Sequence, residues 1–269
     1  MSLTYKGAFR LILQPPMEGR RNMAIDEALL LKASEEDIAP VLRLYGFSPP
    51  TLSLGRFQRL GGMIDRGKIE RNGITLVRRP TGGQAVLHDQ ELTYAVILSR
   101  AHIEPFSKRA IYRFISSLLL EGLRALNIGG AVIRHRIGTP HNPDCFRTSA
   151  EYEIAGREGN KLIGSAQVLT RSASLQHGSI PLNSSYTGIS SYIIADQLSD
   201  KGEKAGEKPA SLESELGRSI SFSKAVSAFT AGFRKLIRIE ESDLNREEME
   251  LAEELYLTKY LKKEWNLKL

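Results

Sequence analysis

The stretch Ile74-Thr-Leu-Val-Arg-Arg-Pro-Thr-Gly-Gly-Gln-Ala-Val-Leu-His-Asp89 leads from an apolar run into two adjacent glycines. Residues 74–77 predict a strand, and the run Leu92-Thr-Tyr-Ala-Val-Ile97 predicts another. Adjacent glycines let backbone N–H groups approach a ligand closely, and the arginines beside them can contact an anion. Two interpretations stay open: a ligand-contacting loop, or a glycine turn between strands with a solvated pair of arginines.

Further strands are predicted on both sides of this stretch. Residues 41–45 and 51–54 alternate with the period of two that is typical of half-buried strands. Residues 152–155 and 161–164 predict a hairpin, because the glycines in the turn between them permit a tight reversal. Extended character then continues over residues 165–182.

Helical patterns lie near both ends of the chain and in one central segment. Asn22 is the predicted N-cap of a helix over residues 23–36. Three later segments have the apolar spacing of amphipathic helices: 107–126, 222–237 and 246–261. The polar stretch 199–218 predicts an exposed loop. Strands grouped in the middle, with helices toward the ends, favour an α+β fold over alternating βαβ units.

The composition is that of an ordinary globular chain. Its 269 residues lie between one and two typical domains, and we expect one compact domain over residues 1–269. Lys and Arg number 37 against 31 Asp and Glu, a net charge of +6 that is spread along the chain and suits an acidic protein partner. The basic residues are not interleaved with aromatic residues, so we predict no nucleic-acid partner. No run approaches the ~18 apolar residues of a membrane span and no signal-peptide pattern is present, so we predict no membrane partner either.

Cys145 is the only cysteine, which excludes an internal disulfide and predicts a cytoplasmic location. A lone cysteine is most often a small buried apolar residue, but the polar segment 140–144 before it suits a reactive thiol. Lys161 is either a surface charge or an ammonium that lowers the pKa of a nearby thiol. His177 fits a hydrogen-bonded core residue. Five scattered histidines and one cysteine have no zinc-ligand spacing, so we predict no metal site.

Together these segments resemble the biotin/lipoate protein ligase and lipoyl(octanoyl) transferase family. RRPTGGQAVLHD, residues 78–89, resembles its acyl-binding motif RRxxGGGxVxHD, with Gln84 in place of the third glycine. KLIGSAQ at 161–167 resembles GxKxxGSAQ, and LQHGSIPL at 175–182 resembles LxHGxLL. The resemblance covers most of the chain. It implies a mixed or antiparallel sheet with a smaller second sheet and flanking helices.

The family contains ATP-dependent lipoate–protein ligases and octanoyltransferases that act through a cysteine thioester. HDQELTYAVI at 88–97 and DCFRTSAEYEI at 144–154 are similar to the transferases, and we expect no accessory domain after residue 261. The resemblance therefore implies transfer of octanoyl from octanoyl-acyl carrier protein to a lysine of a lipoyl-carrier protein, either the glycine cleavage H protein or an E2 lipoyl domain. No cofactor is implied, since ATP and Mg²⁺ belong to the ligase alternative.

Carried over to this sequence, the family pattern makes Cys145 the acyl nucleophile and Lys161 the residue that lowers its pKa. The substrate pocket it implies has two walls, formed by Arg79, Gly82, Gly83 and His88 and by Ser165, Ala166, Gln167 and His177. Three alternatives stay open: an ATP-dependent lipoate–protein ligase, an amidotransferase that moves octanoyl between lipoyl domains, and a non-catalytic acyl-binding sensor.

Overall fold

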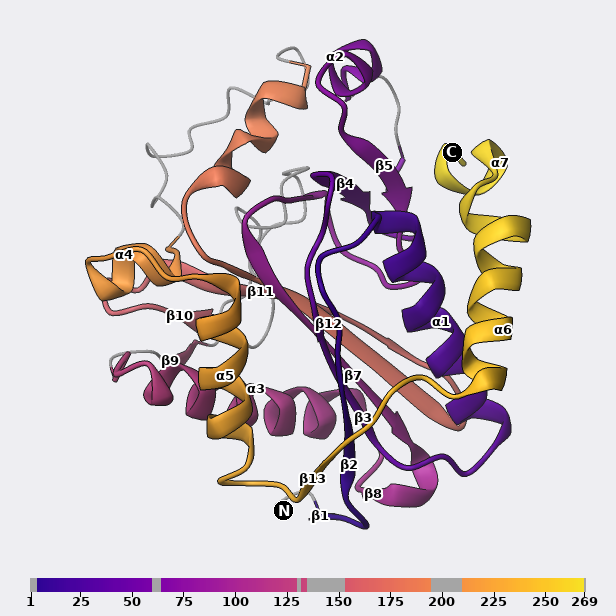
Figure 1. The fold of residues 1–269 in the computed structure, drawn as a ribbon, viewed down its shortest axis with the longest axis vertical. Helices are drawn as coiled ribbons and strands as arrows, with labels where there is room; N and C mark the ends of the chain where they lie inside the picture. Colours follow the sequence, from indigo (N-terminus) through magenta and orange to yellow (C-terminus); the bar gives the residue numbers. More distant parts are fainter. Residues whose placement is uncertain (1–3, 60–63, 130–131, 135–152, 195–209, 269) are drawn as a thin grey trace.

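An eight-stranded mixed sheet runs through the centre of the computed structural model (Figure 1), which describes residues 4–59, 64–129, 132–134, 153–194 and 210–268. The strand order is β13 (Ile239–Glu241), β2 (Phe9–Leu13), β3 (Val41–Tyr45), β7 (Glu91–Ser99), β12 (Ala173–Pro181), β11 (Lys161–Leu169), β10 (Glu153–Ala155) and β9 (Val132–Arg134). The first three strands are mutually parallel, and every later pairing is antiparallel.

A smaller sheet carries the glycine stretch. In it β4 (Thr51–Leu54) lies between β5 (Thr75–Arg78), to which it is parallel, and β6 (Val86–His88), to which it is antiparallel. The loop from β5 to β6 contains Gly82 and Gly83, so both ends of this loop are anchored in the small sheet. Two short strands, β1 (Thr4–Tyr5) and β8 (Ile103–Glu104), pair separately.

Helices cover both faces of the main sheet. On one face α3 (Lys108–Ala125) and α5 (Phe222–Phe233) enclose a core with β3 and β7 side chains such as Leu44 and Val96. On the other face α1 (Gly19–Glu35) and α6 (Arg246–Leu255) pack over Val41 and Ile97 (Figure 1). The remaining helical segments are α2 (Arg66–Arg71), η1 (Arg100–His102), η2 (Ser185–Tyr192), α4 (Leu212–Leu216), a π-helical turn η4 (Tyr256–Tyr260) and α7 (Lys263–Asn266).

This architecture confirms the predicted α+β class with a mixed main sheet, a smaller second sheet and flanking helices. The expectation of half-buried strands at 41–45 and 51–54 is wrong, because both strands are buried along their whole length. Helices on both faces leave β3 no solvent side, so the alternation in its sequence does not report exposure. The short strands β2, β6 and β13 were not predicted from the sequence.

Three boundaries also differ from the predictions. Helix α1 begins at Gly19, where the Glu18 side chain accepts from the Arg21 N–H, while Asn22 is buried inside the helix. The predicted extended run 165–182 is two strands joined by a reversal. Part of the predicted loop 199–218 is helix α4, with its first residue buried against the core; residues 199–209 lie outside the described part of the chain.

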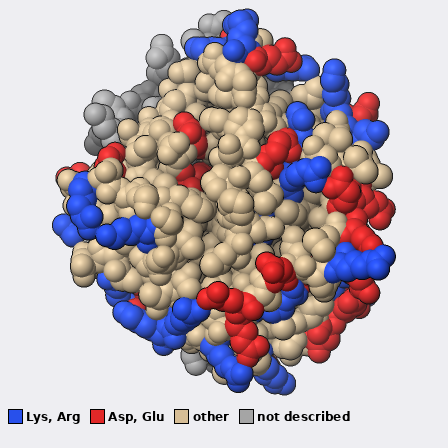
Figure 2. Space-filling model, in the orientation of Figure 1, with Lys and Arg blue, Asp and Glu red and all other residues tan. Residues whose placement is uncertain are grey.

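Charged side chains on the surface are mixed in sign. Figure 2 shows Lys and Arg interspersed with Asp and Glu around the edge of one face, and uncharged residues over most of its centre. Ion pairs tie α6 to α1, namely Arg21–Glu253 at 2.6 Å and Lys32–Glu247 at 2.6 Å. Within the described residues, no helix combines the length and apolar character needed to cross a bilayer.

The close contact of α3 and α5 depends on two glycines. A Cβ on Gly232 would lie 2.4 Å from the backbone of Glu121, and one on Gly122 would lie 2.3 Å from the Phe229 ring. Helical propensity alone predicts that Gly232→Ala stabilises the protein by about 1 kcal/mol. We expect the opposite, a loss of about 1 to 3 kcal/mol in the free energy of unfolding measured by urea, because the helices must move apart.

Gly67→Ala in α2 is the matched control for this prediction. The nearest atom to its added Cβ would be the flexible guanidinium of Arg71, at 3.1 Å. We expect this variant to be neutral or slightly stabilising. Equal effects of Gly232→Ala and Gly67→Ala would contradict the close-packing explanation.

Candidate active site

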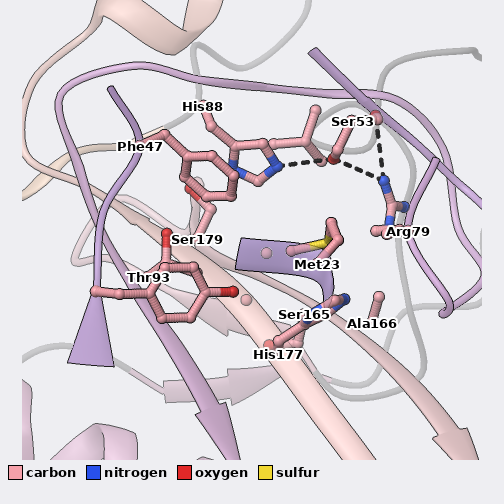
Figure 3. A pocket seen from close by; sticks show the side chains of 14 residues that line it. Met23, Phe47, Ser53, Arg79, His88, Thr93, Ser165, Ala166, His177 and Ser179 are labelled. Atoms are coloured by element: carbon pink, nitrogen blue, oxygen red, sulfur yellow. Dashed lines mark hydrogen bonds between the residues drawn. The ribbon is translucent and has the colours of Figure 1, made fainter. Parts of the chain in front are cut away.

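A cavity lies between the small sheet and the α1-covered face of the main sheet (Figure 3). The empty space in and around it, open solvent included, is about 380 Å³. Its lining comes from α1, both sheets and their loops: Met23, Tyr45, Phe47, Ser53, Arg79, Val86, His88, Thr93, Gly164, Ser165, Ala166, His177, Gly178 and Ser179. Apolar side chains and ring faces make up much of this surface, and a small number of polar groups converge on it, which is typical of a small-molecule site.

Five of the residues predicted from sequence meet at this cavity. Arg79 and His88 lie on the small-sheet side, and Ser165, Ala166 and His177 lie on the main-sheet side (Figure 3). Motifs that are far apart in sequence therefore face one another across a single space.

The buried carboxylate of Asp26 holds the main-sheet wall together. Its Oδ1 accepts from Arg43 Nη1 at 2.7 Å, and its Oδ2 accepts from Tyr45 OH and from His177 Nδ1, each at 2.8 Å. Since a carboxylate only accepts, the proton of His177 lies on Nδ1, and Nε2 is left to accept from Thr81 Oγ1 at 2.7 Å. Asp26 and Arg43 are fully buried.

Burial and hydrogen-bond partners shift the pKa values of Asp26 and His177 in opposite directions. Burial raises the pKa of Asp26, but the Arg43 charge and the hydrogen bonds from His177 and Tyr45 bring it below its ordinary value. Burial lowers the pKa of His177 below 6.5, and the Asp26 carboxylate offsets this only in part. At neutral pH the wall therefore holds an ion pair beside a neutral imidazole.

A second buried carboxylate, that of Glu91 at the start of main-sheet strand β7, bonds to the small-sheet wall. Its Oε1 accepts from His88 Nδ1 at 2.8 Å, and His88 Nε2 lies 2.7 Å from Ser53 Oγ. Arg79 Nη1 donates to the same Ser53 oxygen at 3.0 Å, and Phe47 stacks on the His88 ring with 4.1 Å between centroids. Figure 3 shows the line of hydrogen bonds from His88 through Ser53 to Arg79.

Two hydroxyls complete the surroundings of Glu91. Thr93 donates to Oε1 and Ser179 donates to Oε2. Burial raises the pKa of Glu91, but the electrostatic attraction of the neighbouring His88 and the hydrogen bonds from His88, Ser179 and Thr93 bring it below its ordinary value. The carboxylate is therefore ionised at neutral pH.

The glycine loop is fixed by backbone contacts and by Arg79. Gly83 has φ +94°, and a Cβ on Gly55 would lie 1.8 Å from the Gly83 carbonyl oxygen, so strand β4 and the loop approach closely. Arg79 Nη2 donates to the carbonyls of Gly82 at 2.8 Å and Gln84 at 2.7 Å. Gly82 and Gly83 thus shape the rim of the site but do not line the cavity described above.

Both arginines of the motif are buried, so the interpretation of a solvated arginine pair is wrong. Arg78 fastens the C-terminal segment: its guanidinium donates to the carbonyls of Gly55 at 2.7 Å, Gln58 at 2.8 Å and Lys268 at 2.6 Å. Its role in the described structure is to join the small sheet to the end of the chain.

The remaining predicted residues stand apart from the cavity. Lys161 begins β11, whose middle lines the cavity, and is only 9 % exposed. Gln167 lies further along β11, and its buried amide has no hydrogen-bond partner within the described part of the chain. Cys145 lies outside the described residues, so its proximity to Lys161 stays a prediction.

Several residues of the site were missed from sequence. Asp26 is a carboxylate inside the apolar pattern of α1, and Glu91 precedes an apolar strand within a motif that was recognised for other reasons. A buried charge in such a pattern is a usable signal for a polar network. Ser53 gave no comparable signal. Among the described residues, no group of three or more His, Cys, Asp or Glu side chains is arranged to bind a metal ion.

Fold and cavity together define a lipoyl protein ligase A/B catalytic domain, and the chain belongs to that family. The family's profile matches residues 18–234. Octanoyltransferase LipM of Kyrpidia tusciae is 40% identical over 257 residues, covering 91% of this chain and 93% of the relative. LipM of Bacillus subtilis is 37% identical over 260 residues, covering 92% and 93%.

The solved structures give the same fold. An archaeal bipartite lipoate protein ligase from Thermoplasma acidophilum, studied with its E2 lipoyl domain, matches with a TM-score of 0.75 and 25% identity, covering 97% of each chain. The protein is accordingly a transferase enzyme, with octanoyltransferase activity of the LipM kind in protein lipoylation.

The lowered pKa of His177 makes stability depend on pH. The unfolded chain binds a proton near pH 6.5 that the folded chain does not bind, so the free energy of unfolding decreases on acidification below that value. This one site contributes a slope of up to about 1.4 kcal/mol per pH unit. Urea unfolding between pH 8 and pH 5 measures it, and His177→Gln should show a shallower decrease than wild type. Parallel pH profiles for the two proteins would refute this assignment.

Proposed function

We propose that the protein transfers octanoyl from octanoyl-acyl carrier protein, through a thioester on Cys145, to a lysine of a lipoyl-carrier protein. The acceptor is the glycine cleavage H protein or an E2 lipoyl domain. The observation that supports this most strongly is an apolar cavity whose lining includes residues of all three family motifs, in a chain with LipM relatives over more than 90% of its length.

The cavity suits an uncharged acyl chain. Met23, Phe47, Val86 and Ala166 supply apolar surface, and the polar groups on the walls already bond to one another. An octanoyl chain has no charge, so its binding depends on an apolar slot with few polar anchors. In this proposal Arg79 and His88 form one side of the substrate site, with Gly82 and Gly83 at its rim. Ser165, Ala166 and His177 form the other side, with Gln167 beyond the cavity lining.

The chemistry needs no ATP. Exchange between the carrier thioester and the Cys145 thiolate changes the free energy little, and formation of an amide from a thioester is downhill. A covalent intermediate divides the reaction between two carriers into two successive steps. Lys161 would stabilise the thiolate, and a cation close to a thiol lowers its pKa. The net charge of +6 favours encounter with acidic carriers, an effect that weakens with salt.

Intact-protein mass spectrometry after mixing with octanoyl-acyl carrier protein, without ATP, tests the thioester. We expect a hydroxylamine-labile octanoyl adduct on wild type and none on Cys145→Ala. Lys161→Ala should form the adduct at least tenfold more slowly, while Lys259→Ala, which removes a lysine that pairs with Glu27 outside the cavity, should not.

Each alternative gives a different result in this experiment. Transfer that requires ATP and free acid indicates the ligase. Adduct formation from an octanoylated lipoyl domain, but not from acyl carrier protein, indicates the amidotransferase. Octanoate binding without an adduct indicates the sensor. Any of these three outcomes contradicts the proposed donor or the proposed intermediate.

Ala166→Leu tests the position of the acyl chain. The added methyl groups project from the cavity wall and should reduce loading from octanoyl-acyl carrier protein at least tenfold, because each misplaced methylene costs about 1 to 3 kcal/mol. Loading from a butanoyl donor should change much less. Comparing the two loading rates checks this, and an equal loss for both donors would place the chain elsewhere.

A further inference from the structure

Two relays with the same order of groups face the cavity. In each, a buried carboxylate bonds to the Nδ1 of a histidine whose Nε2 lies 2.7 Å from a hydroxyl. One is Asp26–His177–Thr81 and the other is Glu91–His88–Ser53. The order carboxylate–imidazole–hydroxyl is the one through which hydrolases move a proton.

The two relays differ in the group that a buried guanidinium contacts. In the first, Asp26 already pairs with the buried Arg43, so a proton added to His177 would have to share this carboxylate. The lowered pKa of His177 agrees with this. In the second, Glu91 accepts from two neutral hydroxyls and from His88, while Arg79 donates to Ser53, so a proton moved to His88 is balanced directly by Glu91. This geometry favours the second relay for proton transfer, because a buried charge needs a partner.

The proposed reaction requires such a group. A lysine side chain is almost wholly protonated at neutral pH, since its pKa is about 10.4, and an ammonium has no lone pair with which to attack a thioester. In the proposed function Lys161 stabilises the thiolate as an ammonium, and an ammonium accepts no proton, so we looked for the base elsewhere in the cavity lining. Ser53 lines the cavity, and its oxygen already accepts from Arg79. That fixed positive charge disfavours an ammonium beside it and so favours the neutral amine.

We infer that Ser53, His88 and Glu91 form the proton relay that deprotonates the acceptor lysine in the second half-reaction. The inference rests on the proposed function. The ammonium gives a proton to Ser53 Oγ as the Ser53 proton moves to His88 Nε2, and Glu91 balances the imidazolium charge.

The amine then forms a C–N bond with the thioester carbonyl carbon, and the C–S bond breaks. The departing thiolate takes a second proton from the new amide nitrogen, and His88 releases its proton to solvent. The sum is thioester plus ammonium giving amide, thiol and one proton.

The experiment separates the two half-reactions in Ser53→Ala, His88→Gln and Glu91→Gln. Loading from octanoyl-acyl carrier protein is followed by mass spectrometry, and the loaded protein is then mixed with a lipoyl domain or with hydroxylamine. Hydroxylamine is already neutral at pH 7 and needs no base. We expect transfer to the lipoyl domain to fall about 100-fold or more relative to loading, and by the same factor relative to discharge by hydroxylamine.

Ser116→Ala is the matched control, because it removes a buried serine hydroxyl on α3, on the opposite face of the main sheet. Wild-type transfer to lysine in Ser53→Ala and His88→Gln overturns the relay. Equal slowing with hydroxylamine also overturns it, since the residues would then position the thioester. Loss of loading in Ser53→Ala that matches its loss of transfer also overturns the relay, since Ser53 would then act in the first half-reaction. If Glu91→Gln lowers the midpoint of thermal unfolding, the result for Ser53→Ala decides the test. A wild type that never loads octanoyl refutes the proposed function instead.

Discussion

The carboxylate of Asp26 is the point at which three elements of the fold are joined. It lies on α1, accepts from Arg43 and Tyr45 on β3, and accepts from His177 on β12. Asp26, Arg43 and Tyr45 are fully buried and His177 is nearly so, and these four groups therefore depend on partners inside the protein for their hydrogen bonds. Removing one partner of a buried pair leaves an uncompensated charge at a cost of about 3 to 5 kcal/mol. The position of α1 over the sheet, and with it one wall of the cavity, follows from this network.

The opposite wall depends on close backbone approach. Gly55 has no side chain, which lets β4 lie against the Gly83 carbonyl, and Arg79 ties the loop carbonyls back to Ser53. The arginine is thus more than an anion contact, because it fixes both the loop and the Ser53 hydroxyl. These hydrogen bonds keep the cavity wall in one conformation. A fixed wall helps to hold a flexible acyl chain in position beside the reacting groups.

The sequence predicted some parts of the fold and the site better than others. The helix over 107–126 was predicted closely because its apolar residues repeat with helical spacing, and the structure shows that Ser107 caps it. The start of the helix near Asn22 was predicted wrongly. Asn is a residue type that often caps helices, but here the Asn22 side-chain amide donates to the Gly46 carbonyl at 2.8 Å. The family pattern assigned Arg79, His88, Ser165, Ala166 and His177 to one pocket, and these residues line one cavity in the structure, whereas Ser53 and Glu91 were not singled out.

By itself the sequence determined the class of fold, the family, and the residue types that the chemistry requires, because periodicity, glycine placement and motif order are local properties of the chain. Only the tertiary structure decided which carboxylate faces which histidine. Asp26 lies 151 residues from His177, and Ser53 lies 35 residues from His88. Pairings over such distances are set by sheet register and by the crossing of α1 over β12, and no local pattern encodes them. The difference between the two relays follows from the same packing, since Arg43 reaches the carboxylate of one relay and Arg79 reaches the hydroxyl of the other.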